Sequence, residues 1–203
     1  MAHDLLIGSG NKDKARELMR LLADSSWVVK SLADFDAVEE PEETEDTFDG
    51  NALLKARYYS EKFGVPCVAD DSGLEVDALD GAPGVYSARY AGEDCSYGDN
   101  NEKLLGALSE KSTDERNGRF VCVAAFVDGN GTEHVERGTV DGSIATACRG
   151  DQGFGYDPIF VPDGNDRTFA EMTPEEKHKN SHRGRAFEKM GRYLEDVSAN
   201  RPC

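Results

Sequence analysis

The sequence predicts an α/β fold built on a mixed sheet, because helical and strand-like segments alternate early in the chain and a β-hairpin follows them. Residues 5–7 form a short apolar run that is typical of a buried strand. Gly8 and Gly10 end that run, and a helix is expected to begin at Asn11 or Lys12. Its predicted buried face carries apolar residues three and four positions apart: Ala15, Leu18, Met19 and Leu22.

The next segments repeat this alternation. Residues 27–29 predict a second strand, and residues 48–63 predict a helix that ends at Gly64, a residue type that commonly terminates helices. Residues 67–69 predict a short buried strand that ends in Asp70-Asp71-Ser72-Gly73. Apolar and acidic residues alternate over residues 74–78, which predicts a separate, half-exposed strand.

The second half of the chain predicts a hairpin and two C-terminal helices. Residues 99–108 are expected to be helical, residues 120–127 form the strongest strand pattern, and a turn at residues 128–131 leads into a strand at residues 134–140. Thr173-Pro174-Glu175-Glu176 has the residue types that begin a helix. Ser181 is expected to cap a last helix with one apolar face, made of Ala186, Met190, Tyr193, Leu194 and Val197.

Composition excludes several classes of protein. The 203 residues carry a net charge of −17, which disfavours binding to nucleic acid polymers. No window approaches 18 consecutive apolar residues, and the N-terminus lacks the pattern of a secretory signal, so no membrane association is expected. The five cysteines include no C-x-x-C pair, which argues against a disulfide framework or zinc site and favours a reducing cytoplasm.

Asp70-Asp71-Ser72-Gly73 is the strongest candidate for chemistry. Ligands of α/β proteins gather beyond the carboxyl ends of strands. Two adjacent carboxylates repel each other unless a cation or a shifted pKa stabilises them, and Mg²⁺ prefers oxygen ligands. Because successive strand residues point to opposite faces, Asp70 and Asp71 are expected to differ in role. An acidic turn without function is the alternative.

Four further segments have suitable chemistry, although each also has an ordinary structural explanation. Glycines and free N–H groups at the helix start in residues 9–14 suit an anion, and Lys14 adds a positive charge. A glutamate of the acidic loop, residues 39–45, would complete a metal site with Asp71. In residues 153–158, glycines on both sides of Phe154 expose a ring face for stacking. A basic island interrupts the acidic chain: Lys177, His178, Lys179, His182, Arg183 and Arg185.

In this order the motifs make the sequence similar to the inosine triphosphate pyrophosphatase family, also called the Ham1 family. The resemblance extends from Leu5 to about Leu194. It rests on Ser9-Gly10-Asn11 with Lys14, Thr47-Phe48 with Asn51 and Lys55-Ala56-Arg57, Asp70-Asp71-Ser72-Gly73-Leu74, residues 81–90, residues 153–158, and Ser181-His182-Arg183-Gly184. It implies a single domain over residues 1–203, with an elongated mixed sheet flanked by helices and two lobes around a central active-site cleft.

The resemblance also implies a cytoplasmic, Mg²⁺-dependent homodimer that hydrolyses ITP, dITP and XTP to the monophosphate and pyrophosphate. Asp71 would be the general base and a metal ligand, with Glu42 or alternatively Glu43 as the second ligand. The remaining residues would contact the substrate: Ser9, Gly10, Asn11, Lys12, Asp13 and Lys14 the triphosphate, Ser72 the substrate beside Asp71, and Phe154, Gly155, Tyr156, Asp157, Lys177, His182 and Arg183 the base.

Two other functions fit parts of the same pattern. A pyrophosphatase of the related Maf-like fold would prefer modified pyrimidine or guanine nucleotides. A nucleotide-sensing module would bind a triphosphate without hydrolysing it, although the presence of both Asp71 and Lys14 argues against that function.

Overall fold

The computed structural model describes residues 4–200 except residue 24, and it leaves the side chains of residues 21, 178–180 and 200 undescribed. The strands are β1 (Asp4–Ile7), β2 (Val28–Ser31), β3 (Cys67–Val76), β4 (Asn117–Val127), β5 (Glu133–Ile144) and β6 (Phe160–Pro162). The α-helices are α1 (Lys12–Leu21), α2 (Phe48–Phe63), α3 (Tyr97–Ala107), α4 (Pro174–Asn180) and α5 (His182–Asn200). Short 3₁₀ segments are Leu32–Asp34, Asp77–Leu79, Gly84–Arg89, Thr113–Glu115 and Phe169–Glu171.

The strands form one mixed sheet in the order β2-β1-β3-β4-β5-β6. β1 pairs in parallel with β2, where Asp4 lies opposite Val28, and with β3, where Leu6 lies opposite Cys67. At the other edge β5 and β6 run antiparallel. This arrangement confirms the α/β fold with a mixed sheet.

Two compact units make up the chain. Unit 1 consists of the described residues of Met1–Asp71, Cys122–Gly138 and Arg183–Cys203, and unit 2 consists of Ser72–Val121 and Thr139–His182. The boundaries fall within β3, β4 and β5 and at the start of α5.

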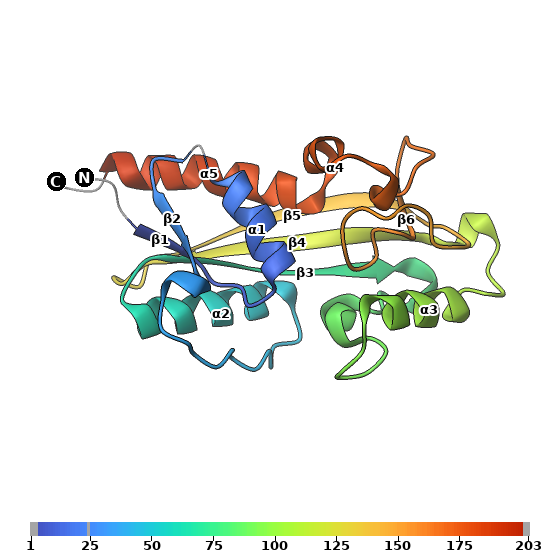
Figure 1. Ribbon diagram of the computed structural model, residues 1–203, viewed down its shortest axis with the longest axis horizontal. Coiled ribbons are helices and arrows are strands. Elements are labelled where there is room, and N and C mark those ends of the chain that lie inside the picture. Colours follow the sequence, from blue (N-terminus) through green and yellow to red (C-terminus); the bar gives the residue numbers. More distant parts are fainter. Residues whose placement is uncertain (1–3, 24, 201–203) are drawn as a thin grey trace. The chain divides into compact units, whose positions relative to one another are not determined.

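Helices cover both faces of the sheet in unit 1. α1 and α5 lie on one face and α2 lies on the other (Figure 1). The α1 and α5 side of the core contains Leu5, Ile7, Ala15, Leu18, Leu22, Val68, Phe126, Ala186, Met190 and Leu194. On this side the indole N–H of Trp27 donates to the Leu194 carbonyl at 3.0 Å. The predicted apolar faces of α1 and α5 are thus the buried ones.

Unit 2 has its own core. Leu104 and Leu108, from α3 and its C-terminal end, pack with Leu74 and Val76 of β3 and with a group of aromatic side chains. That group is Phe120, Tyr156, Phe160 and Phe169. Because these rings come from β4, β6 and the loops around β6, they hold the long segment after β5 against the sheet.

Two sequence predictions about the elements need correction, and one strand was missed. Asp70-Asp71-Ser72-Gly73 does not end a strand, because β3 continues through it to Val76, so the two predicted strands are one. The acids are accommodated there by buried cations, as described below. α3 begins at Tyr97 because Ser96 and Asp99 form a reciprocal capping box. β6 was not predicted; it is three residues long.

No helix within the described part of the chain has the length and apolar character needed to span a bilayer.

Candidate functional site

β3 directs Asp70 and Asp71 to opposite faces of the sheet, as the alternation of strand side chains predicts. Asp70 contacts residues of α1 and α5, whereas Asp71 contacts residues of α2. The two side chains are nearly inaccessible, with 1% and 5% of their residue surfaces exposed. Burial of a carboxylate is costly unless cations or hydrogen bonds compensate, so the surroundings of each acid matter.

Asp70 is flanked by two cations. The Lys14 Nζ lies 3.3 Å and the Arg183 Nε lies 3.8 Å from the same Asp70 oxygen, Oδ2. The buried thiol of Cys122 also donates to Oδ2, at 3.8 Å. Arg183 has a second acid, because its Nη1 donates to Glu17 Oε2 at 3.3 Å. Asp70 therefore fixes a lysine of α1 and an arginine of α5.

Asp71 has a different set of partners. The Lys55 Nζ donates to Asp71 Oδ1 at 3.2 Å and to Glu43 Oε1 at 2.6 Å. The Asn51 amide donates to Asp71 Oδ2 at 3.4 Å. Asn51 and Lys55 are one helical turn apart on the buried face of α2, which is why they reach the same carboxylate.

Burial sets the protonation behaviour of this group. It raises the pKa of Asp71 above the ordinary aspartate range, an effect that Lys55 and Lys14 oppose and that Glu43 and Asp70 strengthen. Burial alone would lower the pKa of Lys55, but Asp71, Glu43 and Asp70 outweigh it, so the pKa of Lys55 is raised. Lys55 is therefore charged, and Asp71 is a stronger base than an exposed aspartate.

The α1 N-terminus is less open to an anion than the sequence predicts. The Asn11 side chain accepts hydrogen bonds from the N–H groups of Asp13 and Lys14, both at 3.1 Å, so two N–H groups expected to be free are already bonded. A Cβ atom added at Gly10 would overlap the carboxylate of Glu40, so the acidic loop lies directly against this glycine. Lys12 and Asp13 are exposed, and Ser9 is half-buried.

The donor set of unit 1 fits a divalent cation. Glu43 and Asp71 converge on one cation, the ammonium of Lys55, so their oxygens are already within reach of a shared positive charge. Carboxylate oxygens are the ligands that Mg²⁺ prefers. Glu42 is exposed. Among the described residues no group of three or more His, Cys, Asp and Glu side chains is arranged around a common point, so further ligands would come from water or substrate.

Unit 2 contains the second group of predicted site residues. The Lys177 Nζ donates to Asp157 Oδ2 at 2.7 Å, and the Phe154 backbone N–H donates to the same oxygen at 2.7 Å. The Lys177 Nζ also lies 4.9 Å from the centroid of the Phe154 ring, within range of a cation–π contact. Asp157 and Lys177 are buried and Phe154 is half-buried.

The loop around Phe154 requires its glycines. Gly153 has φ 77° and Gly155 has φ 64°, conformations that other residues adopt only with strain. A Cβ at Gly153 would also overlap the Asp157 carboxylate. Tyr156 anchors the loop in the core, because its hydroxyl donates to the Ser87 carbonyl at 2.9 Å. The contacts of Asp157 with the Phe154 N–H and with Lys177 hold this loop in place, which the sequence did not indicate.

The residues of the basic island do not act as one cluster, because they contact different partners. His182 is buried in unit 2, where its ring stacks on Phe120 with centroids 4.5 Å apart. Arg183 contacts acids of unit 1, Lys177 contacts Asp157, and Arg185 is exposed. The side chains of His178 and Lys179 lie outside the described part. Ser72, half-buried, follows Asp71 on β3.

We compared the chain with known protein families and with related proteins. The family model described as the Ham1 family matches residues 5–193. The chain belongs to the Ham1 family. The dITP/XTP pyrophosphatase of Elusimicrobium minutum is 43% identical over 194 residues, which cover 94% of this chain and 98% of that protein. The dITP/XTP pyrophosphatase of Vibrio cholerae is 46% identical, covering 95% of this chain and 96% of its own.

A solved structure of a Ham1 protein from Coxiella burnetii matches this fold. Its TM-score is 0.87 and its sequence identity 39%, with 97% of this chain and all of that chain covered. The observed α/β fold with its mixed sheet is therefore the Ham1 fold.

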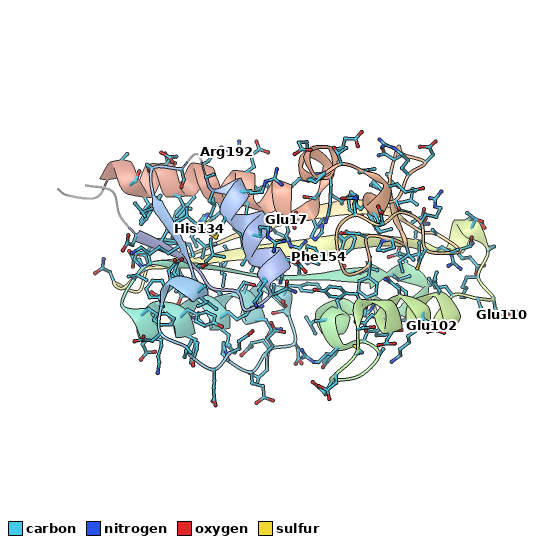
Figure 2. The ribbon with its side chains drawn as sticks, viewed as in Figure 1. Glu17, Glu102, Glu110, His134, Phe154 and Arg192 are labelled. Atoms are coloured by element: carbon cyan, nitrogen blue, oxygen red, sulfur yellow. The ribbon has the colours of Figure 1, made fainter. Side chains whose placement is uncertain are left out.

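The contacts that surround the Ham1 motifs include residues to which the sequence assigned no role. Asn51 and Lys55 belong to the motifs that carry the resemblance, but they were given no role there; their position one turn apart on the apolar face of a predicted helix was a usable signal. Glu17 lies one turn after Lys14 on α1, where Figure 2 labels it. Glu40 is one of several adjacent glutamates, so no feature of the sequence distinguishes it.

Proposed function

We propose that this Ham1 family chain hydrolyses the deaminated purine nucleotides ITP, dITP and XTP to the monophosphate and pyrophosphate, and so removes them from the nucleotide pool. The names of the relatives, dITP/XTP pyrophosphatases, support this substrate class. The observation that carries the chemistry is the buried Asp71, whose pKa is raised and whose carboxylate shares Lys55 with Glu43.

In the proposed reaction Asp71 is the general base. A water molecule attacks the α-phosphorus, Asp71 accepts the water proton on its carboxylate, and the bond from the α-phosphorus to the bridging oxygen breaks. Pyrophosphate leaves with the electron pair of that bond. A base with a raised pKa accepts a proton more readily, and general base catalysis typically contributes about 10²–10⁴-fold to a rate. Asn51 and Lys55 hold the carboxylate in place.

The triphosphate is proposed to lie against residues 9–14, with Ser72 contacting the substrate beside Asp71. Lys14 would offset the negative charge that grows on the leaving pyrophosphate. Its Nζ is already held by Asp70, so part of its conformational freedom is lost before substrate binds.

Asp71 is proposed to hold Mg²⁺ together with Glu42 or, alternatively, Glu43, and the contact of Glu43 with Lys55 beside Asp71 favours the alternative. When bound, Mg²⁺ supplies positive charge that stabilises the phosphate oxygens of the substrate. The two carboxylates and the ammonium of Lys55 between them support this assignment, because the site already balances negative groups against a cation.

The base is proposed to stack on Phe154, with contacts from Gly155, Tyr156, Asp157, Lys177, His182 and Arg183. Donors from Lys177 or Arg183 would pair with the 6-keto oxygen of hypoxanthine or xanthine. The 6-amino group of adenine would leave those donors unpaired, which costs about 1–3 kcal/mol for each buried group. Such a difference would favour ITP over ATP.

A substrate panel tests this function. Purified protein with MgCl₂ is given ITP, dITP, XTP, ATP, dUTP and dTTP, and pyrophosphate and orthophosphate are measured separately. Pyrophosphate release is expected, fastest with the first three. Equal or faster turnover of dUTP or dTTP would favour the Maf-like alternative. Binding of ITP without product would favour a nucleotide sensor.

The proposed homodimer rests on the family resemblance, whereas the cytoplasmic location and the absence of nucleic-acid binding rest also on the cysteine content and on the net charge of −17. We infer a cytoplasmic homodimer that does not bind nucleic acid. Light scattering after size-exclusion chromatography would give about twice the 22.1 kDa chain mass if the dimer forms.

A further inference from the structure

Tyr97 is one of the few large hydrophobic side chains that the described residues leave exposed, with 40% of its surface accessible. It is the first residue of α3, and its position is set by the capping box just before and after it. The Ser96 Oγ accepts from the Asp99 N–H at 3.2 Å, and the Ser96 N–H donates to Asp99 Oδ2 at 2.7 Å. An exposed tyrosine at a helix start contributes little to the core. The observation that carries the inference is its ring contact with Phe154.

One face of α3 contacts the loop that carries Phe154. The rings of Tyr97 and Phe154 have centroids 6.0 Å apart and are tilted by 37°, a direct aromatic contact. Asn101, four residues further on and so on the same helix face, donates from its Nδ2 to the Gly155 carbonyl at 3.0 Å. The helix thus holds the loop at two consecutive residues.

The two glycines beside Phe154 leave the backbone there little restricted, so contacts with other residues must fix its side chain. Phe154 stands between two glycines with positive φ, and glycine restricts the backbone less than any other residue. Its backbone N–H is bound to Asp157, and the ammonium of Lys177 lies over its ring. The contact with Tyr97 adds a restraint on the ring itself.

We propose that Tyr97 is a positioning residue that holds the Phe154 ring in the orientation for stacking on the purine base of the substrate. The proposal rests on the function proposed above. The centroid distance of 6.0 Å leaves no room for a base between the two rings, so Tyr97 acts through Phe154. A ring held in its binding orientation loses less conformational entropy when the base binds, and this raises affinity for the base without changing the reaction at phosphorus.

The test compares the two products as ligands, because each reports on one end of the substrate. IMP contains the base, and pyrophosphate does not. Their dissociation constants are measured by calorimetry for the wild type, Tyr97→Ala, Tyr97→Phe and Glu102→Ala. Glu102 is an exposed residue of the same helix, labelled in Figure 2, and it serves as the matched control. Melting temperatures establish that each variant is folded.

Tyr97→Ala is expected to weaken IMP binding by about two- to tenfold, the range of a lost aromatic pair, and to leave pyrophosphate binding unchanged. With ITP, KM should rise while kcat changes little. Tyr97→Phe should restore IMP affinity because the ring is retained. Glu102→Ala should match the wild type.

Unchanged IMP affinity in Tyr97→Ala would overturn the proposal, and so would an equal loss for IMP and pyrophosphate. Loss of IMP affinity in Tyr97→Phe would assign the effect to the hydroxyl and reject ring positioning. If the wild type releases no pyrophosphate from ITP, the proposed function fails first. Normal turnover of ITP together with normal IMP binding by Tyr97→Ala rejects only the role of Tyr97.

Discussion

Unit 1 surrounds two buried carboxylates with cations, whereas unit 2 surrounds one buried ion pair with aromatic rings. In unit 1, Asp70 is close to Lys14 and Arg183, and Asp71 is close to Lys55. In unit 2, the pair of Lys177 and Asp157 lies beside the rings of Phe154 and Phe169. Charges in a poorly solvated environment interact strongly with a charged ligand, and aromatic faces suit a flat one.

From this difference we expect the triphosphate and the base of a nucleotide to depend on different sets of residues. Changes among the unit 1 acids and lysines should alter turnover for every nucleotide. Changes in the loop of unit 2 should alter the choice of base. Arg183 is the informative exception, because its described partners belong to unit 1 while the family resemblance assigns it to the base.

The largest effect is expected from Asp71→Asn. Asparagine keeps the shape of the side chain but cannot accept the water proton, so kcat for ITP should fall by about 10²–10⁴-fold. The variant should stay folded, because Lys55 keeps Glu43 as a partner. Pyrophosphate release and thermal unfolding measure the two properties. Retained turnover in a folded variant would remove Asp71 from the role of base.

Arg183→Ala should have the next largest effect. If Arg183 donates to the 6-keto oxygen, the ratio of kcat/KM for ITP to that for ATP should fall by roughly ten- to a hundredfold, the value of hydrogen bonds to a charged group. Glu17→Gln weakens a fixing contact of Arg183 and should lower the same ratio by a smaller factor. An equal loss of kcat/KM for ITP and ATP would contradict contact with the base and would place Arg183 with Lys14 and Asp70, whose changes should affect every nucleotide.

The smallest expected effect concerns the pH dependence of kcat/KM, which the protonation of Asp71 in unit 1 should control. Asp71 must be ionised to act as a base, and burial raises its pKa, so kcat/KM should decline with falling pH above the range of an exposed aspartate. Lys55 opposes that shift. In Lys55→Gln the pKa of Asp71 should therefore rise further, and the acid limb of the profile should move to higher pH. Steady-state rates measured across pH 5–9 would show this shift of the acid limb. Lys62→Gln serves as the control, because Lys62 is an exposed lysine of the same helix. An acid limb that stays in place would contradict this electrostatic role.

Local patterns predicted most of the fold. The helices α1, α2 and α5 follow from apolar spacing and from capping residues, which are short-range features. β3 was divided wrongly because acids and glycine are usually found where a strand ends. Whether a strand continues through two acids depends on the cations that neutralise them, and Lys14, Lys55 and Arg183 come from other parts of the chain.

The sequence predicted which types of residue make up the candidate site, but it did not predict which of them contact one another. The motifs identified Asp71, Lys14 and Phe154, yet they did not show that Asn11 occupies two N–H groups of the α1 start or that Glu40 lies against Gly10. Such contacts depend on rotamers and on how a loop folds back, which spacing does not encode. The roles of these residues in catalysis and binding stay predictions.

The opposite orientations of Asp70 and Asp71 also constrain how β3 can change in evolution. Insertion or deletion of one residue between Cys67 and Asp70 would turn every later side chain of the strand to the other face. Asp71 would then face Lys14 and Arg183, and Asp70 would face Lys55 and Asn51. The number of residues in this stretch therefore constrains the site as much as their type does, and we expect length variation among Ham1 chains to fall in the loops outside β3.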